Sequence, residues 1–216
     1  MATKQLQIDI ISDVMCPWCI IGYRRLEQAL SQFNDLDVNI QWHPFELNPK
    51  MGPEGQHLGE HIAEKYGSTP EQSAQNRQRL TQMGADLGFE FNFSDSSRIY
   101  NTLQAHQLLY WAAESGKQTE LKLALFSSYF TEQKNPDDIE VLIEAAAQVG
   151  LDTNEARAVL TDKRFEAAVK EEEQLWIGRG IQAVPAIVFN QQYLISGAQE
   201  PATIAELITK LTTEEA

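Results

Sequence analysis

The chain has 216 residues, of which 43% are hydrophobic, so it can form one domain that carries a large insertion and buries a sizeable core. Its formal net charge of -14 argues against a nucleic-acid partner, because binding to phosphates needs clustered Lys and Arg. The first seven residues lack the apolar stretch of a signal peptide, and no later stretch is long enough to span a membrane. We therefore expect a cytoplasmic protein without membrane contact.

The N-terminal segment predicts a strand, a helix and a second strand. Residues 7–12 alternate as in a strand, and apolar residues then recur at helical spacing from Cys16 to about residue 33. Pro17 is tolerated there because the first helical turn needs no backbone donor. Residues 38–42 alternate between apolar and polar side chains, and Pro44 ends this second predicted strand.

The middle of the chain predicts helices with well-marked starts. Thr69-Pro70-Glu71-Gln72 supplies an N-cap, a proline at the first helical position and a capping-box glutamine. Residues 135–138 and 152–155 repeat this helix-start pattern, and each predicts the start of a new helix. Residues 97–115 carry a broad apolar face, as expected of a packed helix. Because no repeat or flexible linker interrupts this region, we expect five or six helices that form a docked insertion.

The C-terminal segment predicts a hairpin followed by a helix. Residues 184–189 and 193–195 are short apolar runs that flank only three polar residues, so the two strands must be antiparallel. Pro201 then starts an amphipathic helix.

Cys16 and Cys19 are the only cysteines, too few for a disulfide scaffold. The spacing in Cys16-Pro17-Trp18-Cys19 indicates a catalytic or metal-binding pair. A helix N-terminus stabilises a thiolate, so we expect Cys16 to be the exposed, attacking thiol. Cys19 lies almost one turn later and is the expected resolving thiol, buried and protonated.

A metal site is the less favoured interpretation of this pair. Structural zinc needs four ligands, and the sequence offers no second cysteine pair. His57 and His61 could share a helix face, but such pairs are more often ordinary surface residues. We expect His106, which lies on an apolar helix face, to be a core histidine with a hydrogen-bond partner. We therefore expect no metal.

Two carboxylates are candidates for proton handling. Asp13 lies three residues before Cys16 and could exchange a proton with the resolving thiol, although a turn-capping role is equally compatible with its position. Asp9 lies within the apparently buried first strand, where a carboxylate is unusual.

Five segments in order resemble the FrnE-type branch of the DsbA family of thiol-disulfide oxidoreductases. The first reads Ser-Asp-Val-Met-Cys-Pro-Trp-Cys-Ile-Ile-Gly and resembles the active-site segment of that branch. The five segments are residues 12–22, 42–49, 101–106, 180–185 and 195–199. The resemblance extends from about residue 7 to residue 211.

The resemblance implies an α/β protein with a thioredoxin-like fold and a large all-helical insertion between the second strand and the cis-proline strand. Residues 1–50 and 175–216 would form the discontinuous thioredoxin-like domain. Residues 51–174 would form the helical insertion domain.

The resemblance also implies the site residues. Pro185 would be cis, lie beside Cys16 and belong to the catalytic set, and the backbone of Val184 would pair with an extended substrate. Pro17 and Trp18 would contact substrate as well. The sequence departs from the family pattern at Ala183, where we expect glycine. Trp18 replaces the histidine of periplasmic DsbA proteins, so strong oxidising power is not implied.

The expected function is dithiol-disulfide exchange with protein or small-molecule thiols, with glutathione as a candidate co-substrate and no other cofactor. An alternative is a glutathione-dependent isomerase or transferase of the hydroxychromene-carboxylate isomerase or kappa class. These enzymes typically carry serine at the first active-site position, so Cys16 favours redox chemistry. A third hypothesis is a non-enzymatic, redox-switched binding module. The oligomeric state stays open.

Overall fold

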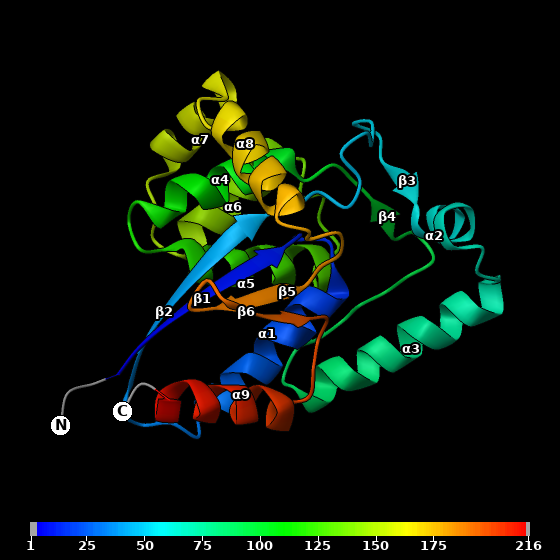
Figure 1. The fold of residues 1–216 in the computed structure, drawn as a ribbon. Helices are drawn as coiled ribbons and strands as arrows, with labels where there is room; N and C mark the ends of the chain where they lie inside the picture. Colours follow the sequence, from blue (N-terminus) through cyan, green and yellow to red (C-terminus); the bar gives the residue numbers. More distant parts are fainter. Residues whose placement is uncertain (1–3, 215–216) are drawn as a thin grey trace.

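The computed structural model describes residues 4–214, and a four-stranded mixed sheet lies at its centre (Figure 1). The strands are β1 (Lys4–Ser12), β2 (Leu36–Pro44), β5 (Ala186–Phe189) and β6 (Tyr193–Ser196), in the order β2-β1-β5-β6. β1 and β2 are parallel, whereas β5 is antiparallel to both β1 and β6. The predicted hairpin is confirmed.

Nine helices accompany the sheet within the described residues. They are α1 (Pro17–Leu30), α2 (Leu58–Tyr66), α3 (Pro70–Asp86), α4 (Leu103–Ala113), α5 (Gln118–Phe130), α6 (Ile139–Gln148), α7 (Thr153–Asp162), α8 (Glu166–Gly178) and α9 (Pro201–Glu214). Seven of them, α2 to α8, lie between β2 and β5. The predicted α/β class and thioredoxin-like fold with a helical insertion are confirmed.

Two details of the insertion differ from the expectation. It contains seven helices rather than five or six, and a short antiparallel pair, β3 (Gln56–His57) with β4 (Arg98–Ile99), means that it is not all-helical. The helix expected over residues 97–115 begins only at Leu103. Arg98 and Ile99 pair with β3 instead, and the side chain of Asn101 accepts the Leu103 N–H at the helix start.

The two faces of the sheet are covered by different helices (Figure 1). Ile8 and Ile10 of β1 point to the face that packs against α1 and α9. Ile11 points to the other face, where it packs with Trp176 of α8. Figure 1 shows α4, α6, α7 and α8 on this second side of the sheet.

The insertion is tied to the rest of the protein through shared cores. Phe126 and Phe130 of α5 belong to the same apolar cluster as β1 and α1, whereas α4 to α7 bury a second cluster that includes Leu108 and Leu121. The predicted division into residues 1–50 with 175–216 and residues 51–174 stays a prediction.

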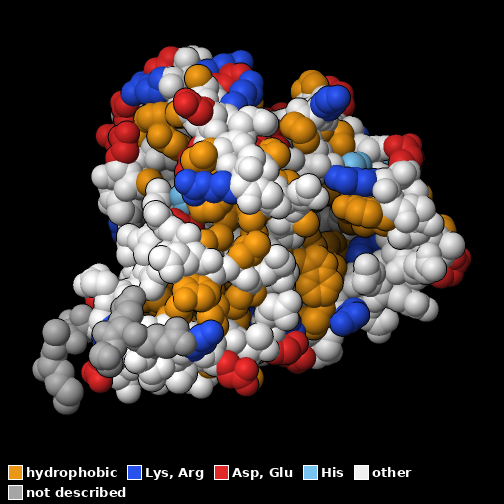
Figure 2. All heavy atoms as spheres, in the orientation of Figure 1, with side chains coloured by type: hydrophobic (Ala, Val, Ile, Leu, Met, Phe, Trp, Pro, Cys, Tyr) orange, Lys and Arg blue, Asp and Glu red, His pale blue; other side chains and the backbone are white. Residues whose placement is uncertain are grey.

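The helix starts expected at residues 69–72 and 152–155 are confirmed, whereas the helix expected from residues 135–138 begins later, at Ile139, with Asp138 as its N-cap. Thr69 and Gln72 form the reciprocal capping box, and Asp138 and Asp152 each accept backbone N–H groups at the start of the following helix. No helix within residues 4–214 combines the length and the apolar character needed to cross a membrane. In Figure 2, hydrophobic side chains gather in the middle of the visible face, with charged side chains mostly around its rim.

Candidate active site

The site forms where the parallel strands β1 and β2 end. Asp13 follows β1 directly, and its carboxylate accepts the Leu47 N–H at 2.7 Å and the Met15 N–H at 3.3 Å. Its backbone carbonyl accepts the Cys16 N–H at 3.1 Å, which leads the chain into α1. Asp13 is fully buried and does have the turn-stabilising role that the sequence allowed. Its role in proton handling stays a prediction.

The two cysteines lie in the first turn of α1. Cys16 is the N-cap residue, and both thiols are free. Cys19 is 0% exposed, as expected, but Cys16 is only 4% exposed, so the expectation of an exposed Cys16 is wrong. The reason is a neighbouring segment: the Cys16 Sγ donates to the carbonyl oxygen of Val184 at 3.6 Å.

The two thiols titrate as a pair. The pKa of Cys16 is raised well above its usual value because of the interaction with the Cys19 sulfur and because it is buried close to Asp13. Burial alone would also raise the pKa of Cys19, but the Cys16 thiol, the Ser12 hydroxyl and the charge of Lys122 outweigh it, and this pKa is lowered. The pKa of each thiol therefore depends on the protonation of the other.

The segment before β5 completes the rim of the site. The Val184–Pro185 bond is cis, as the resemblance implies. α1 packs closely against this segment, because a Cβ at Gly22 would lie 3.2 Å from the Pro185 Cγ. Pro17 and Trp18 are partly buried, and Trp18 packs against the core that contains both cysteines. The structure thus brings six of the predicted site residues together: Cys16, Cys19, Pro17, Trp18, Val184 and Pro185.

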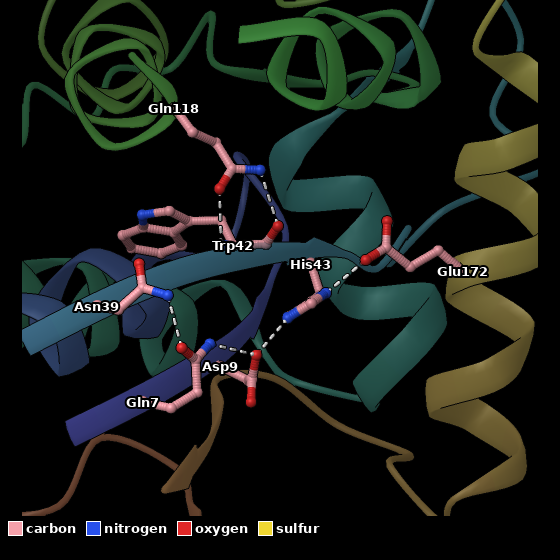
Figure 3. Close-up of polar contacts among 7 residues, drawn as sticks. All are labelled: Gln7, Asp9, Asn39, Trp42, His43, Gln118 and Glu172. Atoms are coloured by element: carbon pink, nitrogen blue, oxygen red, sulfur yellow. Dashed lines mark hydrogen bonds and ion pairs between the residues drawn. The ribbon is translucent and has the colours of Figure 1, made fainter. Parts of the chain in front are cut away.

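Asp9 has other contacts. Its carboxylate lies 2.9 Å from Nε2 of His43 and accepts the Gln7 side chain at 3.1 Å, and the His43 Nδ1 contacts Glu172 (Figure 3). Asp9 alternates with Ile8 along β1, so it points to the face of the sheet opposite to α1. Burial alone would lower the pKa of His43, but the carboxylates of Asp9 and Glu172 raise it.

Lys122 and His106 were not predicted as parts of the site. Lys122 of α5 is 0% exposed, and its Nζ donates to the Ser12 carbonyl at 3.4 Å. His106 is buried as expected, but its Nε2 has no hydrogen-bond partner within the described residues, contrary to the expectation. It lies 3.8 Å from the Asp13 carboxylate. The burial of Lys122 could have been inferred from the sequence, because Lys122 lies within the apolar run from Leu121 to Phe126.

The electrostatics of Asp13 follow from these neighbours. Burial alone would raise its pKa, but His106, the Leu47 N–H and the charge of Lys122 together lower it. Asp13 is therefore a carboxylate that stays ionised although it is buried.

Glu46 is a second carboxylate near the dithiol that the sequence did not single out. It is buried, and this burial, together with the negative charges of Glu173 and Asp13, raises its pKa to about 7. Asn101 donates to its carboxylate at 3.2 Å. Glu46 therefore gains or loses a proton near neutral pH.

Tyr66 at the end of α2 also lies within electrostatic reach of Cys16. Its pKa is raised by burial of the hydroxyl and then by the negative charge of Cys16. The ring is nevertheless 63% exposed, and Lys65 beside it donates to the Leu47 carbonyl at 2.8 Å, which holds α2 over the loop after β2.

The histidines weighed as metal ligands have other partners. His57 contacts the Asp95 carbonyl at 2.7 Å, and His61 contacts the side chain of Gln56 at 2.8 Å. Within residues 4–214, no group of three or more His, Cys, Asp and Glu side chains is arranged to hold a metal ion.

Comparison with known proteins shows the family to which the chain belongs. The family model described as the DSBA-like thioredoxin domain matches residues 7–209. The chain belongs to the DSBA-like thioredoxin family. Membership of this family supports the assignment of the chain as an oxidoreductase or a related enzyme. This agrees with the general enzyme class expected from the sequence.

Two relatives match most of the chain. It is 31% identical to a probable DsbA oxidoreductase from Streptomyces coelicolor, SCO1869, whose crystal structure superposes with a TM-score of 0.91 and coverage of 97% of this chain and 91% of the other. It is 27% identical over 194 residues to YwbO of Bacillus subtilis (strain 168), with coverage of 89% and 90% of the two chains.

A more distant member of the DSBA-like group shares the fold. The cytosolic disulfide reductase DsbM from Pseudomonas aeruginosa, solved with GSH, superposes with a TM-score of 0.66 at 18% identity, with coverage of 95% of this chain and 99% of the other. At this identity the likeness shows the common fold alone.

Proposed function

We propose that this protein is a dithiol-disulfide oxidoreductase of the FrnE-type branch, and that it exchanges disulfides with protein or small-molecule thiols through Cys16 and Cys19. The observation that carries the proposal is the reduced pair at the start of α1, with the Cys16 Sγ 3.6 Å from the carbonyl of Val184. Membership of the DSBA-like thioredoxin family supports it.

Access decides which thiol attacks. Cys19 is 0% exposed and Cys16 is 4% exposed, so we assign the attack on a substrate disulfide to Cys16. As it attacks, its proton passes to the neighbouring Cys19 sulfur, whose interaction with Cys16 is the main influence on the Cys16 pKa. Cys16 then carries a mixed disulfide, and one substrate sulfur leaves as a thiolate.

Resolution reverses the roles of the two sulfurs. Cys19 loses its proton and attacks the Cys16 sulfur, which forms the intramolecular disulfide and releases the second substrate thiolate. Because both thiols lie in one helical turn, the attacking group has a high effective concentration.

The substrate would lie against Val184 and Pro185. The Val184 carbonyl accepts the Cys16 thiol in the reduced protein, so a substrate that reaches Cys16 meets this backbone at once. We assign Val184 to backbone pairing with an extended substrate segment, and Pro17, Trp18 and Pro185 to the walls around it.

Asp13 is the carboxylate that we assign to proton handling at the dithiol. Its buried charge influences both Cys16 and Lys122. Asp9 contacts His43, and no hydrogen bond within the described residues joins it to either thiol, so a role for Asp9 in proton handling stays a prediction.

Glutathione is the small-molecule co-substrate that we propose, and a cytoplasmic location is the compartment in which it would be used. The distant relative DsbM is a cytosolic disulfide reductase solved with GSH, which supports both assignments. The competing isomerase or transferase function requires bound glutathione without disulfide chemistry.

Two assays on one preparation test the proposal. Reduction of insulin with glutathione as the electron donor measures disulfide exchange, and a titration with reduced glutathione measures binding. We expect exchange that is lost in Cys16→Ser. Glutathione binding without exchange would favour the isomerase or transferase function, and neither activity would favour a binding module.

A further inference from the structure

The segment that faces Cys16 lies beyond the regular strand pairing. Pairing in β5 begins at Ala186, which lies opposite residues of both β1 and β6. Val184 and Pro185 come before this point, although the Val184 carbonyl lies only 3.6 Å from the Cys16 Sγ. The distance between this segment and the dithiol is therefore set by other contacts.

The loop between β6 and α9 supplies one of these contacts. It spans residues 197–200 and leads into α9, which packs beside α1 (Figure 1). The Gly197 N–H donates to the Pro185 carbonyl at 2.8 Å. Gly197 has a φ of 74°, a left-handed conformation that favours glycine, so the chain can turn away from β6 directly at this bond. The position of Pro185 therefore depends on the position of the loop.

Helix α1 contacts both the loop and the segment. Gly22 and Arg25 are three residues apart, so they are neighbours on the surface of the helix. A Cβ at Gly22 would lie 3.2 Å from the Pro185 Cγ and 3.5 Å from the Ala198 Cβ, so this glycine allows a close approach of both. Because α1 also carries the two cysteines, one helix relates the segment to the dithiol.

Arg25 fastens the loop to this helix. Its Nη1 donates to the Ala198 carbonyl at 2.6 Å, and its Nη2 pairs with the Glu200 carboxylate at 2.7 Å. The planar guanidinium presents several donors in a fixed arrangement, which a lysine ammonium does not. The Arg25 side chain is 14% exposed, whereas that of Glu200 is 69% exposed. The bond to the Ala198 carbonyl is therefore the contact that we expect to matter, since exposed ion pairs contribute little.

We propose that Arg25 is a positioning residue that fixes the substrate-docking segment, Val184 and Pro185, relative to Cys16. It acts through the loop of residues 197–200, which it holds against α1 and which holds the Pro185 carbonyl in turn. The inference rests on the proposed function, in which a substrate pairs with the Val184 backbone. No hydrogen bond or ion pair within the described residues joins Arg25 to either cysteine, so its influence on the reaction is indirect.

Loss of this contact should affect substrates according to how they dock. A peptide disulfide uses both the Cys16 sulfur and the Val184 backbone, so it reacts slowly when the two are displaced relative to each other. A small disulfide without a peptide backbone needs only access to Cys16. A selective loss of peptide reactivity therefore distinguishes a positioning role from simple destabilisation, which would slow both reactions alike.

Two mixed disulfides of thionitrobenzoate test this with the reduced protein. One is formed with an extended peptide that has a single central cysteine, and the other with mercaptoethanol. In each, Cys16 attacks the sulfur of the peptide or of mercaptoethanol, the disulfide bond breaks, and the same coloured thionitrobenzoate anion leaves. Arg25→Met should lower the rate constant for the peptide roughly tenfold and leave that for mercaptoethanol unchanged. Arg25→Lys should lie between the wild type and Arg25→Met.

Two control variants isolate the contact with the loop. Arg24→Met removes the preceding arginine, which pairs with Glu27 of the same helix at 2.7 Å, and it should leave both rate constants unchanged. Glu200→Gln keeps the bond from Arg25 to the Ala198 carbonyl and removes only the exposed partner. It should therefore change the peptide rate constant by less than about twofold.

A second variant and a substrate-free measurement address the same interface. Gly22→Ala places a methyl group 3.2 Å from the Pro185 Cγ, so it should displace the segment and slow the peptide reaction selectively without removing a charge. Amide hydrogen exchange reports the loop directly. Exchange of the Gly197 N–H, which the Pro185 carbonyl accepts, should be faster in Arg25→Met than in the wild type.

The outcomes separate this inference from the proposed function. Equal losses with the two disulfides in either Arg25→Met or Gly22→Ala would overturn the inference, as would unchanged exchange of the Gly197 N–H in Arg25→Met. If the wild type attacks neither disulfide but Arg25→Met speeds this exchange, the result would support the positioning of the segment by Arg25 and count against the proposed function alone.

Discussion

Two buried polar clusters flank the end of β2, and they are built differently. His43 lies between the carboxylates of Asp9 and Glu172, with the Asp9 contact at hydrogen-bond distance (Figure 3). On the side of the dithiol, Lys122 forms no ion pair within the described residues, and His106 lies 3.8 Å from Asp13. The charged groups of the first cluster are in direct contact, although one Asp9 oxygen has no hydrogen-bond partner among the described residues, whereas those of the second cluster are held apart.

The difference suits the first cluster to a structural role and the second to the proposed thiol chemistry. Charges in direct contact stabilise one arrangement and respond little to their surroundings. Charges held apart in a buried region retain part of their desolvation penalty. Their pKa values therefore change when a thiol nearby gains or loses a proton. Each of the following predictions concerns a substitution that removes a charged group from one of the two clusters.

The largest effect is expected for Asp13→Ala. It removes the buried acceptor of the Leu47 and Met15 N–H groups and leaves Lys122 without its neighbouring carboxylate, so the free energy of unfolding should fall by about 4 kcal/mol. The pKa of Asp13 is lowered, so its contribution is present above pH 3.8 and is lost as the pH falls through the folded-state pKa. Urea denaturation at pH 7 and pH 3 measures this. A loss below about 1 kcal/mol at pH 7 would contradict it.

Lys122→Met should change stability in the opposite direction. The folded-state pKa of about 8 lies below the usual 10.5, so burying the cation costs stability at every pH below about 8. The variant should therefore be more stable than the wild type at pH 7, by up to about 3 kcal/mol. The gain should shrink as the pH rises from 8 to 10.5. Denaturation curves across this range decide it, and a destabilised variant at pH 7 would show that the Trp42 and Ser12 contacts outweigh the burial cost.

A smaller effect is expected for His43→Gln. The pKa of His43 is raised, so its pairing with Asp9 and Glu172 stabilises the fold fully below pH 6.5 and is lost as the pH rises through the folded-state pKa. The loss should be about 2 kcal/mol at pH 6 and less at pH 9. Exchange activity should be retained. His57→Gln, at a more exposed histidine, is the control, and an activity loss in His43→Gln with an unchanged fold would move this cluster into the active site.

Much of this architecture was predictable from local patterns. The helix starts at Thr69, Asp138 and Asp152 depend on side chains that contact their own first turn, so neighbouring residues suffice to predict them. The pair of cysteines at the start of α1 is equally local. The helix that begins at Leu103 instead of residue 97 shows the limit, because β4 forms through pairing with β3, far away in the sequence.

The electrostatics of the site were less predictable for the same reason. Lys122 of α5 contacts Ser12 and His106 of α4 lies near Asp13, although both are about a hundred residues beyond Cys16 in the chain, and no local pattern joins them. Helix position alone assigned the thiolate to Cys16. The burial of Cys16 under Val184 and the mutual dependence of the two thiol pKa values are tertiary effects, which the position of a residue in a helix does not reveal.

Trapping of the mixed disulfide tests the central claim most directly. Cys16→Ser and Cys19→Ser are each exposed to oxidised glutathione and analysed by intact-mass spectrometry. If Cys16 attacks and Cys19 resolves, Cys19→Ser should accumulate one glutathione adduct on Cys16, because the intermediate persists without the inner thiol. Cys16→Ser should form little adduct, since Cys19 is fully buried. Equal labelling of the two variants, or labelling chiefly of Cys16→Ser, would contradict the roles assigned to the two sulfurs.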